Sequence, residues 1–190
     1  MNPRTFLVLI AAGGLAALGW WLQAHIRPPE RAPTRATAAA PDYYIDDFTA
    51  TTMDAAGLPR QRLTAATLLH YASDGHADLT RPRMTFFRSE GAPWDARSET
   101  GWVSGDNETV KMLGAVHISR AASAVNRAVT VDTRNLLVKP NDDYAETPER
   151  AIIRSEGSTL QGIGMRARFN LGQLDLLSQV HGEYVNEKSK

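Results

Sequence analysis

The chain has 190 residues, with 21 basic and 21 acidic side chains, no cysteine and 43% hydrophobic residues. This length allows one ordinary domain with an appendage, because domains most often have roughly 100 to 150 residues. The charge balance argues against a nucleic-acid-binding protein, which carries surplus Lys and Arg, and against a highly charged disordered chain. Without cysteine, the sequence can form no disulfide, thiolate metal site or cysteine nucleophile.

The first predicted element is an uninterrupted apolar run, Phe6–Leu22. As a helix it would be roughly 26 Å long, close to the ~30 Å hydrocarbon thickness of a bilayer. We therefore expect residues 1–26 to be a short N-terminal stub and a transmembrane helix, with Trp20 and Trp21 in the headgroup region. A cleaved signal peptide is the alternative, but the small residues Ala38–Ala40 lie well beyond the end of the apolar run.

The charges that flank this helix conflict with an exported domain. Arg4 precedes the apolar run, whereas Arg27, Arg31 and Arg35 follow it. The positive-inside rule places the more basic flank in the cytoplasm. The charge count alone therefore leaves the orientation open.

Small residues recur at spacings of three and four within the apolar run. Such a face lets another membrane helix approach closely, although Gly and Ala are also common in membrane helices in general. The residues predicted to pack against a partner helix are Gly13, Ala16, Ala17 and Gly19.

Residues 27–41 are rich in Pro, Ala and Arg and have no apolar periodicity. Such a segment cannot bury a core, and its prolines keep it extended. We therefore predict a tether over 27–41 and a folded domain over 42–190.

Short alternating apolar runs, separated by turn residues, follow the tether. Met84 and Phe86 alternate in one run, and a strong turn signal, Ser104–Asn107, separates two others. Many short strands at about 8 to 12 residue spacing predict an all-β sandwich or barrel. Residues 60–72 could also form a helix with one apolar face, but their threonines and the lack of helix caps favour a strand.

Signals for chemistry are weak in this sequence. His70 and His76 flank Asp74 and Asp78, an arrangement that the polar side of a turn explains better than a metal site. The sequence has no Gly-rich phosphate loop and no Ser nucleophile elbow. We therefore expect no catalytic residues, no metal and no cofactor, and we do not expect an enzyme.

The order of the parts along the chain is distinctive of one protein family. The predicted membrane helix and tether are followed by Asp42–Tyr44, a Gly57–Leu58 turn and the stretch Leu63–Pro82. Near the end, Gly162–Ala167 and Val180–Tyr184 are similar to a closing hairpin. In these features and in its length the sequence resembles the LptC family of lipopolysaccharide export proteins of Gram-negative bacteria.

The resemblance implies a cytoplasmic N-terminus, one inner-membrane helix and a periplasmic β-jellyroll, an open V-shaped two-sheet sandwich of short antiparallel strands. Its apolar groove would receive the acyl chains of lipopolysaccharide from the membrane subunits LptF and LptG, driven by the ATPase LptB. It would pass them to LptA, whose similar jellyroll adds edge to edge. The main alternative is a membrane-anchored β-sandwich scaffold that binds protein partners without a lipid path.

Position in the predicted strands and likeness to the family select the candidate site residues. Those expected to line the groove, with ordinary sandwich core as the alternative, are Phe48, Leu79, Phe86, Leu113, Val116, Met165, Leu174 and Tyr184. Those expected at the docking edges, in the first and last strands and the first turn, are Tyr44, Ile45, Gly57, Leu176 and Val180. The turn glycine is expected to supply a conformation that a β-carbon opposes.

Overall fold

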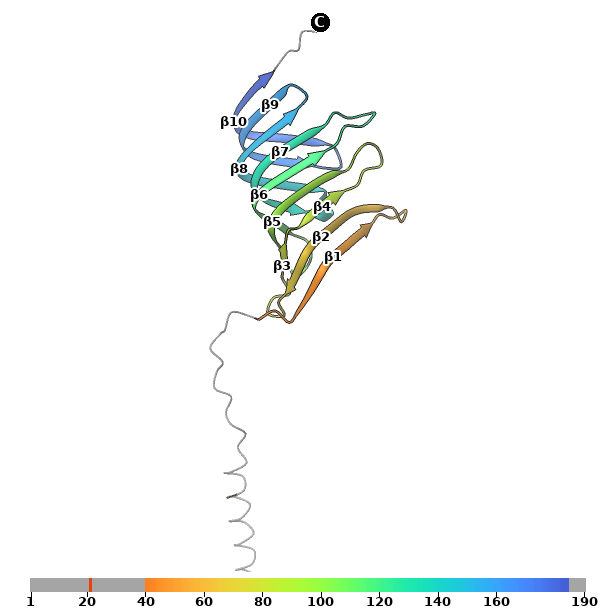
Figure 1. Cartoon of the computed structure of the whole chain (residues 1–190), viewed down its shortest axis with the longest axis vertical. Coiled ribbons are helices and arrows are strands. Elements are labelled where there is room, and N and C mark those ends of the chain that lie inside the picture. Colours follow the sequence, from red (N-terminus) through yellow and green to blue (C-terminus); the bar gives the residue numbers. More distant parts are fainter. Residues whose placement is uncertain (1–20, 22–39, 185–190) are drawn as a thin grey trace, which may run out of the picture. The chain divides into compact units, whose positions relative to one another are not determined.

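The computed structural model describes Trp21 and residues 40–184. The chain divides into two units, Met1–Ala38 and Ala39–Lys190, and all described strands belong to the second unit (Figure 1). No described helix is long and apolar enough to cross a membrane. Apart from the helical Trp21, the predicted transmembrane helix lies outside the described residues, together with Gly13, Ala16, Ala17 and Gly19.

Antiparallel strands make up almost all of the described domain. Their bounds are β1 (Tyr43–Met53), β2 (Pro59–His70), β3 (Ala77–Thr80), β4 (Arg83–Phe86), β5 (Trp94–Val103), β6 (Val110–Arg120), β7 (Val129–Lys139), β8 (Tyr144–Ser155), β9 (Ser158–Arg168) and β10 (Gln173–Tyr184), with a short 3₁₀ helix, η1 (Pro140–Asp142), after β7. The prediction of an all-β domain is confirmed. The ambiguous segment 60–72 forms a strand over most of its length, not a helix.

The strands follow one another across the sheet nearly in chain order. The hydrogen-bonded order is β1-β2-β3-β5-β6-β7-β8-β9-β10, and β4 also pairs with β2 and β5, at the level where β3 has ended. Successive hairpins therefore build the sheet from one side to the other. β1 and β10 are its two edges.

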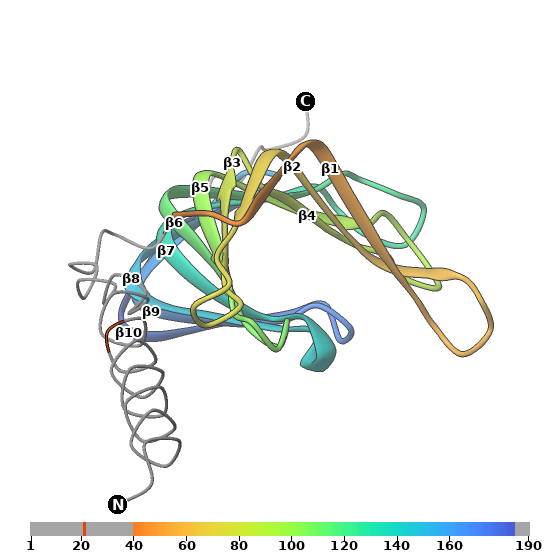
Figure 2. The same cartoon turned by 90° about the horizontal axis from the view of Figure 1, so that it is seen from below.

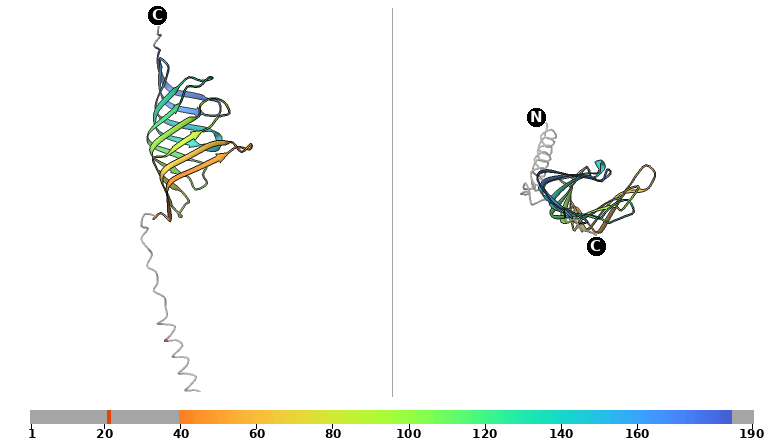
Figure 3. Two further views of the ribbon diagram at one scale, coloured as in Figure 1. Left: turned by 45° about the vertical axis from the view of Figure 1, so that its right-hand side comes forward. Right: turned by 90° about the horizontal axis from the view of Figure 1, so that it is seen from above.

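A line of kinks folds this sheet into two facing walls. Left-handed backbone conformations recur at nearly the same level of successive strands, at Asp47, Arg81, Gly114, Asn135, Gly164 and Gln179. Register shifts in β5, β6, β7, β8 and β10 fall at this level too. Because such irregularities bend a strand and increase its twist, the sheet folds into an open V (Figure 2) whose two walls also face each other in the end-on view of Figure 3. We call the wall that contains β3 the first wall and the wall that contains β4 the second wall.

Matching rows of side chains line the inner face of each wall, because directly paired residues point to the same side of a sheet. The row on the first wall runs through Tyr43, His70, Ala77, Val103, Val110, Val138, Ala145, Ala167 and Leu174. The row on the second wall runs through Ala50, Leu63, Met84, Ala96, Ile118, Val131, Ile153, Leu160 and Gly182. Their central members are fully buried, so the core lies between the walls.

Candidate functional site

The walls separate at the β1–β2 end of the sheet and leave a cavity between them. Its volume is about 480 Å³. Inner side chains of the first four strands supply its apolar lining, whereas the β5–β6 turn and η1 supply polar groups. The apolar lining residues include Ile45, Phe48, Ala50, Leu63, Leu68 and Met84.

The edge strand β1 keeps this cavity open to its surroundings. Tyr43 and Ile45 belong to the inner face of the first wall, yet they are 48% and 40% exposed. Among the strands that the structure describes, no further one pairs with the free side of β1. Apolar side chains exposed together on one face are typical of a binding surface, so this end of the domain can take up an apolar ligand.

A polar clasp joins the two walls beside the cavity. Arg60 of β2 forms an ion pair with Asp143, at 2.9 Å between Nη2 and Oδ2, and donates a hydrogen bond of 2.7 Å to the carbonyl of Asn141. The neighbouring Gln61 side chain donates to the carbonyl of Pro140. The clasp therefore ties the second wall to the η1 turn, where the first wall ends.

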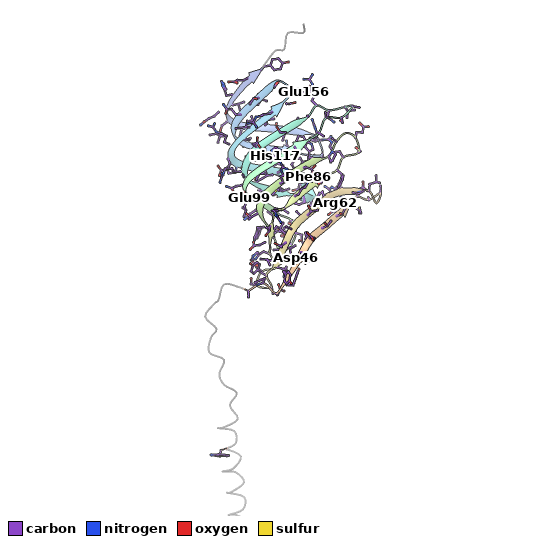
Figure 4. All side chains as sticks on the ribbon, viewed as in Figure 1. Asp46, Arg62, Phe86, Glu99, His117 and Glu156 are labelled. Atoms are coloured by element: carbon purple, nitrogen blue, oxygen red, sulfur yellow. The ribbon has the colours of Figure 1, made fainter. Side chains whose placement is uncertain are left out.

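An aromatic cluster closes the mouth of the V farther along the sheet. Phe169, which follows β9, stacks on Phe86 of β4 at 4.2 Å between ring centroids and lies 5.9 Å from Trp94. Figure 4 labels Phe86. Arg120 covers the indole ring of Trp94 at 4.7 Å, and Arg88 donates a hydrogen bond of 2.7 Å to the carbonyl of Phe169. The walls are thus in contact here, in contrast to the open β1–β2 end.

Histidine and aspartate pairs lie apart from one another and not in one cluster. His70 contacts Asp42 at 2.7 Å and His117 contacts Asp132 at 2.8 Å. Hydrogen bonds from His117 and Arg154, offset in part by burial, lower the pKa of Asp132. Among residues 40–184 and Trp21, no three His, Asp or Glu side chains come close enough to hold a metal ion.

Comparison with known proteins identifies the family to which this open, two-walled domain belongs. The family model described as "Lipopolysaccharide-assembly, LptC-related" matches residues 8–185. The chain belongs to the LptC family. No curated protein sequence matches it significantly.

A solved structure shares the LptC-family fold seen in this chain. It is LptH of Pseudomonas aeruginosa, described as the LptA homologous periplasmic component of the conserved lipopolysaccharide transport device. The TM-score is 0.51 and the sequence identity 11%, over 66% of this chain and 94% of LptH. At this identity the likeness shows the fold alone, an LptA-like jellyroll of antiparallel strands.

The predicted groove residues of this LptC-family chain fall into three settings. Phe48 lines the open cavity. Five others occupy the closed part between the walls, either buried or packed against the core: Leu79, Phe86, Val116, Met165 and Leu174. Tyr184, at the end of the edge strand β10, is exposed.

Leu113 lies on the other face of the sheet. It pairs with Thr100, whereas the preceding residue, Met112, pairs with Gly101 and is fully buried on the inner side. Because neighbouring residues of a strand point to opposite faces, Leu113 points away from the groove, and it is 38% exposed. The expectation that it lines the groove is therefore corrected.

The predicted docking residues lie on the two edges of the sheet and not in one place. Tyr44 is exposed on the outer face of β1, Ile45 lines the cavity, and Gly57 lies in the β1–β2 turn with a φ of +77°. On β10, Leu176 packs against the core and Val180 is exposed. The whole width of the sheet separates the two groups.

Sequence reasoning singled out Phe86, as a groove residue, but not the other residues that close the mouth. One of them carried a readable signal, because Arg120 continues the alternation of Val116 and Ile118 and is thus a charged residue on an inner face. The others come from the start of β2 and from turns, and they meet across the V, which no local pattern reveals. The closing residues that sequence reasoning missed are Arg60, Gln61, Arg88, Arg120, Asp143 and Phe169.

Proposed function

We propose that this LptC-family protein receives lipopolysaccharide at the β1–β2 end of its jellyroll, shelters the acyl chains between the walls and passes them on at the β10 end. Family membership makes it a component of lipopolysaccharide transport. The observation that carries the proposal is the cavity of about 480 Å³ that opens beside β1, with apolar side chains of β1 to β4 on its walls. Each methylene group moved out of water there contributes about 0.8 kcal/mol, so binding needs apolar area and not a catalytic group.

Passage along the V requires the walls to part. In the middle of the sheet the inner side chains are fully buried, including Met112, Ile118 and Val131. At the mouth, the clasp between Arg60 and Asp143 and the stacking of Phe86 on Phe169 hold the two walls together. An acyl chain therefore moves from the cavity toward β10 as these contacts open.

The two sheet edges are the proposed docking surfaces for protein partners. An edge strand has unpaired backbone groups that a strand of another protein can join. We infer that β1, with Tyr44, Ile45 and the Gly57 turn, faces LptF and LptG. β10, with Leu176 and Val180, then faces LptA, and LptB supplies the energy from the other side of the membrane.

Residues 1–26 are proposed to anchor the protein in the inner membrane. The apolar run is long enough to cross a bilayer, and the tether over 27–41 then connects it to the jellyroll, residues 42–190, in the periplasm. The small residues Gly13, Ala16, Ala17 and Gly19 form the proposed contact face for a membrane helix of the complex.

Photo-crosslinking at two consecutive residues of β1 separates a lipid path from a protein scaffold. Phe48 lines the cavity, whereas Thr49 is exposed on the opposite face. With a photoreactive amino acid in cells, we expect position 48 to label lipopolysaccharide and position 49 to label it far less. Labelling of protein alone at both positions would support the scaffold and contradict the lipid path.

A further inference from the structure

Two arginine side chains meet at the mouth of the V without an acidic partner. A β-carbon built on Gly172 would lie 2.8 Å from Nη1 of Arg88 and 3.6 Å from Nη1 of Arg120, so both guanidinium groups approach this glycine. Neither arginine forms an ion pair with any described residue. Two positive charges held close to the same glycine repel each other. A bound anion would offset this electrostatic repulsion.

Hydrogen-bond donors of the same cluster also lack an acceptor. Trp94 Nε1 and Arg120 Nε are both buried without a hydrogen-bond partner, and Trp94 as a whole is 1% exposed. Arg120 otherwise donates one hydrogen bond, of 3.2 Å, to the carbonyl of Arg127. Burial, together with the nearby Arg88, lowers the pKa of Arg120. Unsatisfied donors and uncompensated positive charge in one place point to an anionic ligand.

A small cavity lies beside Arg88, the first arginine of the pair. Its volume is about 160 Å³, several times the ~30 Å³ that a water molecule occupies in the liquid. Phe86 and Phe169 supply part of its lining, and its polar lining residues are Arg60, Arg88, Ser89, Asp143 and Asn170. Asp143 already pairs with Arg60 in the clasp. The charge of Arg88 thus stays available to a ligand.

We propose that Arg88 and Arg120 bind a phosphate group of the lipopolysaccharide saccharide while the acyl chains lie between the walls. Guanidinium groups match phosphate oxygens in geometry and form short, charge-assisted hydrogen bonds with them. The pair lies at the mouth, where a saccharide attached to chains between the walls would emerge. The inference rests on the proposed function and names the part of the substrate that this site recognises.

The test compares three probes on the full chain in detergent: inorganic phosphate, the phosphorylated acyl-disaccharide of lipopolysaccharide, and the same acyl-disaccharide with its phosphates removed. We expect the phosphorylated lipid to bind about 10-fold more tightly than the dephosphorylated one, as charge-assisted hydrogen bonds contribute. Arg88→Gln and Arg120→Gln should abolish this preference, measured as the ratio of the two lipid affinities within each variant, because the same residues also hold the mouth closed. Arg134→Gln, which removes the same charge from an exposed position, should keep the preference.

The indole N–H signal of Trp94 in an NMR spectrum provides a direct readout of the site. We expect the phosphorylated lipid to shift this signal, and the dephosphorylated lipid to shift it less. Arg120→Lys keeps the positive charge but loses the planar guanidinium group, so it should retain part of the preference. This variant keeps the test decisive if the Gln variants fail to fold.

Each other outcome overturns a defined part of the proposal. Equal binding of both lipids by the unaltered chain would overturn the phosphate site and leave the acyl groove standing. A response to inorganic phosphate without a preference for the phosphorylated lipid would show a free-anion site and overturn the assignment to lipopolysaccharide. Binding of neither lipid would overturn the proposed function and this inference with it.

Discussion

At the scale of single residues, a substitution of Gly57 tests its role in folding apart from its proposed role in docking. Its φ of +77° costs a residue with a side chain about 1 kcal/mol, but a β-carbon there would meet no atom within 4 Å. We expect Gly57→Arg to lower the Tm by several degrees and to reduce co-purification with LptF and LptG much more strongly. Gly57→Asn, which tolerates this backbone conformation, is the control and should assemble. Normal assembly of the Arg variant would refute a docking role.

A second prediction for a single residue concerns Asp132, whose lowered pKa makes the stability of the fold depend on pH. Its pKa is lowered in the folded state by His117 and Arg154. A carboxyl group of this kind stabilises the fold above its unfolded pKa of about 3.9, and that stability is lost as the pH falls through the lower folded value. Because the side chain of Asp132 is 47% exposed, we expect Asp132→Asn to cost only about 0.5 kcal/mol at pH 7. Thermal unfolding at a series of pH values should show the difference between the two proteins shrinking as the pH falls below the unfolded pKa of about 3.9. A constant difference would argue against the ion pairs as its cause.

At the scale of elements, the edge strand β10 can be tested without disturbing the core. Val180 is 57% exposed and lies where the pairing of β10 with β9 is interrupted. We expect Val180→Asp to leave the Tm nearly unchanged but to weaken binding of LptA at least several-fold, because a buried charge at an interface is costly. Leu171→Asp introduces the same charge in the exposed β9–β10 turn and should bind normally. Pull-down with purified LptA measures both, and equal binding by the two variants would exclude β10 as the docking edge.

The strands and the kink line differ in how far they could be predicted from the sequence. Alternation correctly indicated strands such as β4 and β6, since one face of each is buried. The kink line was not predictable, because several of its left-handed residues, among them Asp47, Asn135 and Gln179, are not glycine. The placement of Leu113 was wrong because a strand pattern does not say which of its two faces is the inner one.

At the scale of the whole molecule, the proposed lipid path requires that the cavity beside β1 be free. Ala50 lines the cavity and is exposed within it. We expect Ala50→Trp to fill much of the space, to preserve the fold, and to reduce binding of lipopolysaccharide about 10-fold or more. Thr49→Trp, one residue along on the opposite face, is the matched control. Unchanged binding by Ala50→Trp, measured with fluorescent lipopolysaccharide, would rule out this cavity as the receiving end.

The kink line has a consequence for how the V opens. The long strands run from one wall into the other through this line, so the two walls are halves of one hydrogen-bonded sheet and not separate sheets. Rotation about the kinks, as about a hinge, widens the V and leaves the strand pairing on both sides intact. The clasp, the side chains that meet across the mouth and the inner side chains packed between the walls then have to separate. On the proposed function, we therefore expect the V to widen for an acyl chain without loss of the hydrogen bonds between its strands.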